Sequence, residues 1–130
     1  VIDPDGRFAA VFGQSTAGLT YMPSDVDGPA TEVVVVDLEK RAVVARSPVV
    51  GVLGDALIDG QQLVWFPKKG TQFYRLKFNG ATEAEAIDIG RPSAEFCALG
   101  PQQYLTIETD VNDGTIYVVR DRHTLEAAPV

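Results

Sequence analysis

The hydrophobic residues of this chain alternate with polar ones or form short continuous runs, and no long window has the period of an amphipathic helix. Apolar residues alternate with basic ones in TQFYRLKF (71–78), and QQYLTIE (102–108) and TIYVVRD (115–121) are similar. EVVVVDL (32–38) is a continuous β-branched run, which is typical of a strand buried on both faces. These patterns predict a protein built from short β-strands.

Turn-forming dipeptides fall between the predicted strands. Many short strands at this spacing indicate an all-β protein, such as a sandwich, a trefoil or a propeller. The segment GATEAEAI (80–87) has a helix-like composition, but its short length and its β neighbours favour an extended strand. The turn signals are Asp5-Gly6, Asp59-Gly60, Asn79-Gly80, Gly100-Pro101 and Asp113-Gly114.

The segments also repeat along the chain. When residues 59–78 are placed over residues 100–121, Gln61-Gln62 falls on Gln102-Gln103 and Gly70-Thr71 falls on Gly114-Thr115. The opening PDGRFAAVFG takes the same place in a first unit, which continues after a long insertion with ATEVVVVDL. Each unit ends on a similar strand. The units predicted from this alignment are 1–51, 52–90 and 91–130.

The order of turns and strands in VIDPDGRFAAVFG, EVVVVDLEKRAVV and GTIYVVRDRHTLEAAPV resembles the blades of WD40-like and YVTN-type β-propellers. The resemblance covers nearly the whole chain, although no unit carries a Trp-Asp pair and the middle unit diverges. It implies a partial propeller of about three four-stranded antiparallel blades. The innermost strands would lie near 1–3, 53–58 and 93–99. The alternatives are a β-trefoil and a β-sandwich.

Three blades are too few for a closed ring, because propellers typically have four to eight. The resemblance therefore implies that a second protein chain, or further copies of this one, completes the propeller. It also implies that residues 1–130 are one all-β domain or a propeller segment, and it favours a bacterial location outside the cytoplasm. A closed ring of two copies would contain six blades.

Composition narrows the choice of partners. The chain has 130 residues and a net charge of −7, from 11 basic and 18 acidic side chains. An acidic protein repels the phosphate backbone, so we expect no nucleic-acid partner. No apolar run reaches the roughly 20 residues that cross a bilayer, so we expect no membrane span.

Single residues add little chemistry. Cys97 is the only cysteine and has no thiol to pair with, so we expect a small buried hydrophobic residue. Trp65 lies within a strand and is expected in the core. His123, the only histidine, is expected in a solvated turn, beside a charged rim that includes Arg120 and Arg122. No catalytic set, cofactor motif or metal-ligand spacing is visible, since the glycines of DVDG and DVNDG come too early for a calcium loop.

The resemblance places the candidate site in the loops that share one end of a propeller, at 13–31, 67–70, 109–114, 49–55 and 88–94. Tyr21 and Met22 suit a protein contact or tether the long first loop. Lys68 and Lys69 form a small basic spot that suits an acidic partner. The candidate residues for ligand or partner binding are Tyr21, Met22, Asp25, Asp27, Lys68, Lys69, Arg91, Asp110 and Asn112.

Three hypotheses about function follow. The first is a non-catalytic propeller segment that acts as a binding scaffold for a protein or ligand. The second is part of a larger propeller enzyme, of redox or lyase type, with its active site mainly on other blades. The third is a small acidic protein of the inhibitor or immunity type, with Asp25 and Asp27 against a basic partner.

Overall fold

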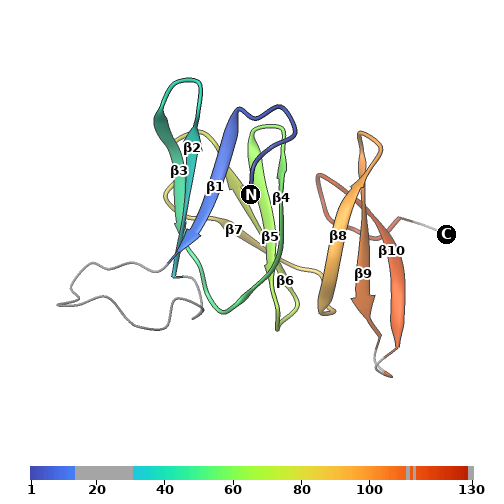
Figure 1. Cartoon of the computed structure of the whole chain (residues 1–130). Coiled ribbons are helices and arrows are strands. Elements are labelled where there is room, and N and C mark those ends of the chain that lie inside the picture. Colours follow the sequence, from blue (N-terminus) through green and yellow to red (C-terminus); the bar gives the residue numbers. More distant parts are fainter. Residues whose placement is uncertain (14–30, 111, 113, 129–130) are drawn as a thin grey trace.

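The computed structural model describes residues 1–13, 31–110, 112 and 114–128, and they form three antiparallel sheets (Figure 1). This confirms the all-β class, and the described residues contain no helix. Hence none of the described segments offers a helix long and apolar enough to cross a membrane. The strands are β1 (Phe8–Gly13), β2 (Glu32–Asp37), β3 (Ala42–Pro48), β4 (Leu53–Asp59), β5 (Gln62–Pro67), β6 (Gln72–Lys77), β7 (Glu85–Asp88), β8 (Ser93–Leu99), β9 (Gln103–Thr109) and β10 (Thr115–Asp121).

The first sheet has the strand order β1-β2-β3, and an isolated bridge from Ile2 to Ala9 adds the opening segment to its edge. In β2, Val33 and Val35 are fully buried, whereas Val34 and Val36 are only partly buried. The prediction that residues 32–38 are buried on both faces is therefore wrong for the described residues. Only one face of this sheet contacts another sheet, so the valines on its other face remain accessible to solvent.

The central sheet has the order β4-β5-β6-β7 and is covered on both faces. Its strand β5 holds the continuous buried run Leu63–Phe66. Trp65 is buried, as predicted, and stacks on Tyr74 with ring centroids 5.5 Å apart. Residues 85–88 of the ambiguous helix-like segment and its flank form the edge strand β7, so the prediction of an extended strand is confirmed for that part.

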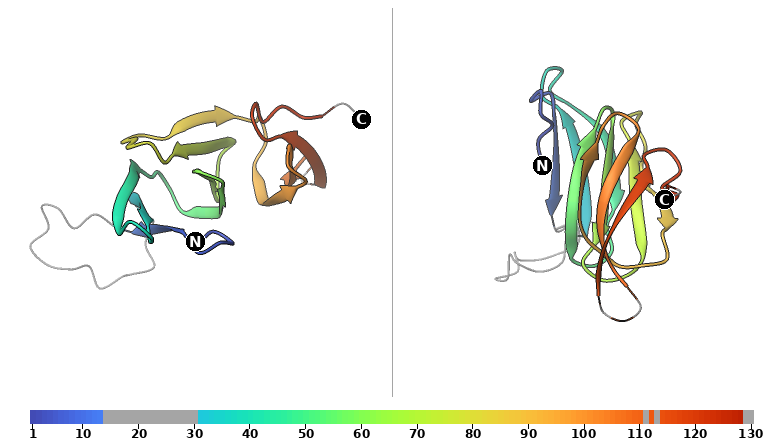
Figure 2. Two further views of the ribbon diagram at one scale, coloured as in Figure 1. Left: turned by 90° about the horizontal axis from the view of Figure 1, so that it is seen from above. Right: turned by 90° about the vertical axis from the view of Figure 1, so that its right-hand side faces the viewer.

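The third sheet has the order β10-β9-β8, and a bridge from Arg120 to Ala127 extends it beyond β10. One face of the central sheet packs against the first sheet and the opposite face packs against the third. Seen from above, the three sheets follow one another without closing into a ring (Figure 2). Each sheet pairs only its own strands, so the described residues do not form one shared barrel.

Polar contacts join the central sheet to the third sheet. The Tyr104 hydroxyl donates to Asp59 Oδ2 at 2.5 Å, and Arg122 Nη1 contacts Asp59 Oδ1 at 2.8 Å. Arg75 donates from the central sheet to the backbone carbonyls of Arg122 (2.6 Å) and His123 (2.9 Å). Hydrogen bonds to charged groups are stronger than neutral ones, so these contacts fix how the two sheets meet.

Two expectations about single side chains are wrong. Cys97 is exposed, because it lies on the face of β8 that no described sheet covers. Arg120 is buried and binds Glu108, so it does not belong to a charged rim, and Arg122 is engaged by Asp59. His123 is exposed in a turn, as predicted.

The paired positions of the hairpins β4–β5 and β8–β9 correspond to one another, although the turn of the second hairpin is one residue longer. Asp59 pairs with Gln62 and Leu57 with Val64 in the first hairpin, as Leu99 pairs with Gln103 and Cys97 with Leu105 in the second. Each hairpin also has a bulge at the same place, between Leu53 and Asp55 in β4 and between Ser93 and Glu95 in β8. A bulge adds one unpaired residue at a defined point, so its recurrence marks equivalent positions in the two hairpins.

The turns after β2 and β10 are also alike. Asp37 Oδ1 accepts hydrogen bonds from the amides of the residues two and three positions later, and Asp121 Oδ1 does the same. The residue four positions after each aspartate has a positive φ, 54° at Arg41 and 61° at Leu125. Non-glycine residues seldom adopt this conformation, so the two turns follow one uncommon template.

Candidate functional site

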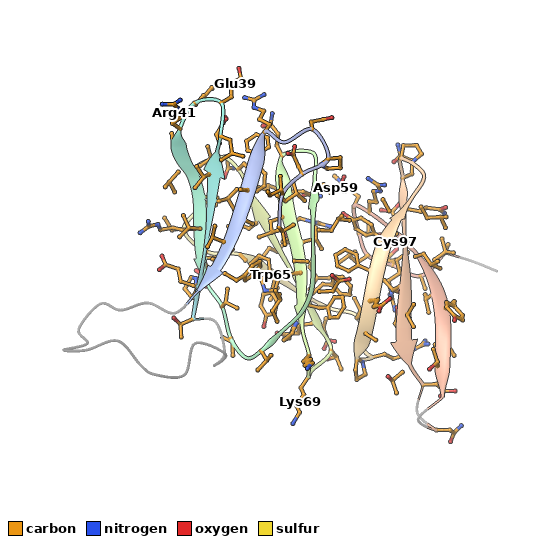
Figure 3. The ribbon with its side chains drawn as sticks, viewed as in Figure 1. Glu39, Arg41, Asp59, Trp65, Lys69 and Cys97 are labelled. Atoms are coloured by element: carbon orange, nitrogen blue, oxygen red, sulfur yellow. The ribbon has the colours of Figure 1, made fainter. Side chains whose placement is uncertain are left out.

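One end of the molecule gathers the turn β5–β6, the turn β9–β10 and the links that lead from each sheet to the next (Figure 1). Lys69 lies at this end, which we call the loop end, and Glu39 and Arg41 lie at the opposite end (Figure 3). Loops carried by a rigid sheet scaffold are common sites of binding. The loop end is therefore the first place to look for a site.

A groove of about 570 Å³ opens at the loop end, between the link β3–β4 and the turn β5–β6. The Lys68 amide donates to the Val52 carbonyl at 2.7 Å and ties the two segments together. Gly51 and Gly70 have φ angles of 79° and 108°, which side chains rarely allow, and they bend the two walls. The lining residues are Val50, Gly51, Val52, Pro67, Lys68, Lys69, Gly70, Thr71, Gln72 and Tyr74.

The groove combines apolar surface with positive charge. Val50 and Val52 are exposed although they are large aliphatic side chains. The Tyr74 ring is held by its stacking on Trp65, and its hydroxyl donates to Gln72 Oε1 at 3.0 Å. Lys68 and Lys69 are exposed in the same lining. A few polar groups around an apolar surface are typical of a binding site.

The lining contains no Asp, Glu, His or Cys, and its ionisable side chains are those of Lys68, Lys69 and Tyr74. Across the described ranges, no three His, Cys, Asp or Glu side chains converge in a way that could hold a metal ion. The exposed lysines and aliphatic side chains of the groove are complementary to a segment with apolar and anionic groups.

The predicted site residues that the structure describes are divided between the groove and other places. Lys68 and Lys69 line the groove, but Arg91 is half-buried and its charge acts on Glu108 of β9. Asp110 and Asn112 belong to the turn β9–β10, where Asp110 Oδ1 accepts from the Asn112 amide at 3.3 Å. The remaining candidates, Tyr21, Met22, Asp25 and Asp27, lie outside the described residues.

Sequence reasoning missed most of the groove. The loop 49–55 was predicted to belong to the site, but neither Val50 nor Val52 within it was singled out. The other missed residues were assigned to a strand: Thr71, Gln72 and Tyr74. The available signal was VVGV (49–52), where large aliphatic residues flank a glycine in a link that has no strand pattern. Exposed apolar side chains that form a contiguous patch are a feature of contact surfaces.

A second hollow of about 450 Å³ lies at the opposite end, and four of its charged side chains, those of Asp3, Arg7, Asp59 and Arg122, have hydrogen-bond or ion-pair partners. Asp59 binds Tyr104 and Arg122, and Asp3 Oδ1 accepts from the amides of Arg7 (2.6 Å) and Phe8 (3.0 Å). These carboxylates hold turns and neighbouring sheets. We therefore assign this hollow a structural role.

Four of the described carboxylates have a pKa below the usual value, and one of them is Asp88, whose pKa is lowered by hydrogen bonds from the Gly90 amide and Thr71. The Lys40 amide and Arg7 lower the pKa of Asp37 in spite of burial, and the amides of Thr124 and His123 lower that of Asp121. Burial raises the pKa of Glu108, but hydrogen bonds from Arg120 and Thr106 outweigh it, so the pKa is lowered overall. In each case the folded state favours the charged form.

Acid is expected to destabilise the protein through these groups. A carboxyl group whose pKa is lower in the folded state than in the unfolded state stabilises the fold at pH values above its unfolded pKa. That unfolded pKa is about 4 for Asp and Glu. That contribution is lost as the pH falls through about 4 towards the folded values. Denaturant unfolding at a series of pH values should show this decline, and it should be shallower in Asp121→Asn. A free energy of unfolding that stays constant down to about pH 3 would contradict the assignment.

No protein-family model matches the chain, and no curated protein matches its sequence.

Proposed function

We propose that this chain is a segment of a β-propeller that acts as a non-catalytic binding scaffold. The observation that carries the binding role is the groove at the loop end, where two exposed lysines border exposed aliphatic side chains. The partner that suits this lining is a protein segment with acidic and aliphatic side chains. Another chain, or further copies of this one, would complete the propeller.

Three features support the propeller part of the proposal. The three antiparallel sheets pack face to face rather than edge to edge. The hairpins β4–β5 and β8–β9 have corresponding paired positions and a bulge at the same place. The turns at Asp37 and Asp121 share their hydrogen bonds and a positive φ four residues later. Radial repetition of one small sheet is the organising feature of propellers.

Charge supports the choice of an acidic segment. The chain as a whole is acidic, so it repels acidic proteins at long range. At physiological ionic strength this repulsion is screened beyond about 8 Å, and the lysines at the groove then dominate the contact. Binding is therefore expected to depend on close contact in the groove, and to weaken as salt is added.

The test uses an acetylated and amidated peptide of alternating glutamate and leucine as the probe. Titration of the peptide should shift the NMR amide signals of Gly51, Val52, Gly70 and Thr71. Lys68→Glu with Lys69→Glu should weaken binding about tenfold, because two favourable ion contacts become repulsive. The matched control is Lys40→Glu with Lys77→Glu, which makes the same change in charge at exposed sites outside the groove lining.

Shifts at the groove that disappear only in the Lys68 and Lys69 variant would support the proposal. Equal loss in both variants would reduce the effect to net charge and contradict a specific site. The absence of shifts at the four groove amides would contradict the proposal directly.

A further inference from the structure

The two sheets at the ends of the stack each leave one apolar face uncovered. Among the described residues, five large hydrophobic side chains are exposed on strands or on segments bridged to them. All five belong to the first or third sheet: Ile2, Val11, Val43, Leu99 and Tyr117. Strands β4 to β7, whose sheet is covered on both faces, contribute none. The uncovered faces are therefore a property of position in the stack.

Register gives Tyr117, the most exposed large hydrophobic residue of the third sheet, a buried counterpart in the central sheet. In the third sheet, Tyr117 of β10 pairs with Ile107 of β9. In the central sheet, Tyr74 of β6 pairs with Trp65 of β5, and Phe73, the residue before Tyr74, has the position equivalent to Tyr117. Phe73 is 1% exposed because the third sheet covers it, whereas Tyr117 is 71% exposed. The outer face of the third sheet thus repeats a face that is buried when a further sheet follows.

The same comparison holds for the outer face of the first sheet. Ile2 pairs with Ala9 as Ile58 pairs with Leu63, yet Ile2 is 66% exposed and Ile58 only 4%. Val11 pairs with Val34 at the place where Trp65 pairs with Tyr74, and the exposed fractions are 60% and 1%. The outer face of the first sheet thus repeats a face that is buried when another sheet precedes it.

We propose that the two uncovered faces bind each other head to tail between copies of this chain. The outer face of the third sheet in one copy packs on the outer face of the first sheet in the next. This contact continues the two sheet-on-sheet interfaces within the molecule, which join the same two kinds of face. A second copy is the occupant that presents both kinds of face, and burial of their apolar area drives the contact.

The smallest closed assembly has two copies and six sheets, within the usual size of a propeller. Cys97 is labelled on β8 in Figure 3, and Leu105 pairs with it on the same face, so both lie in this interface. The inference rests on the propeller part of the proposed function and does not depend on the groove.

The experiment measures the mass of the full chain by light scattering and sedimentation over a range of concentrations. Val11→Glu places a charge on the outer face of the first sheet, and Tyr117→Glu places one on that of the third. The control is Leu38→Glu, which adds the same charge at an exposed turn outside both faces. Circular dichroism establishes that each variant is folded.

We expect the wild type and Leu38→Glu to have twice the 14.0 kDa mass of one chain, and each face variant alone to be a monomer. A mixture of the two face variants should again form a two-chain species, because one intact face of each kind remains between them. The double variant should stay monomeric in every mixture.

A wild type that is monomeric at all concentrations would overturn self-association. Either face variant retaining the wild-type mass alone would overturn the head-to-tail contact. The peptide titration distinguishes these failures from failure of the groove, because Lys68 and Lys69 lie outside both faces.

Discussion

Replacing Glu108 with leucine is expected to destabilise the protein by about 3–5 kcal/mol, because it leaves Arg120 buried without its counter-ion. The Arg120 Nε and Nη2 atoms bind the two carboxylate oxygens of Glu108 at 2.7 and 2.8 Å. Thr106 donates to the same carboxylate, and Arg120 Nη1 donates to the Leu125 carbonyl at 2.8 Å. The side chains of Glu108 and Arg120 are 0% and 6% exposed, so water cannot replace the lost partner.

Denaturant unfolding measures this effect, with Glu39→Gln as the matched control. The Glu39 side chain is 74% exposed and lies 3.7 Å from Arg7 Nε, so its loss should cost less than about 1 kcal/mol. The double variant Glu108→Leu with Arg120→Met should be more stable than Glu108→Leu alone, because it leaves no buried charge. A single variant as stable as the control would show that the buried pair does not hold the third sheet.

Replacing Trp65 with alanine is expected to cost about 3–5 kcal/mol, because it opens a cavity between the first and central sheets. Trp65 is fully buried, stacks on Tyr74 and meets Phe12 of the first sheet edge to face, with centroids 5.7 Å apart. Since Tyr74 lines the groove, we also expect changed NMR signals at the loop end. This loss of stability is a large share of the free energy of unfolding of a typical domain, which is roughly 5–15 kcal/mol.

The control for this variant is Leu38→Ala, a large apolar side chain in an exposed turn. Its truncation should change the free energy of unfolding by less than about 0.5 kcal/mol. If Trp65→Ala unfolded at the same denaturant concentration as Leu38→Ala, the first and central sheets would not share a packed core.

The sequence predicted strands and turns well, because both are set by neighbouring residues. Strands expected near 53–58 and 93–99 are Leu53–Asp59 and Ser93–Leu99 in the structure. Alternation of apolar and polar residues fixes the faces of a strand, and glycine with aspartate or asparagine fixes the turns. The alignment of Gln62 with Gln103 also agrees with the observed register.

The candidate site was less accessible to such reasoning. Lys68 and Lys69 were named, but Val50 and Val52 become part of the same lining only through the hydrogen bond from the Lys68 amide to the Val52 carbonyl. Tyr74 belongs to it because Trp65 holds its ring on that side. Contacts between segments distant along the chain leave no periodic signal in either segment.

The sequence by itself determined that this is an all-β protein and where most of its strands begin and end. Only the tertiary structure decided which strand faces are covered. The valines of 32–38, Cys97 and Arg120 were all misjudged, since burial depends on whether another sheet or an opposite charge lies against a side chain. The hydrophobic pattern of a strand indicates which of its faces can be buried, but only packing determines which of them is covered within one molecule.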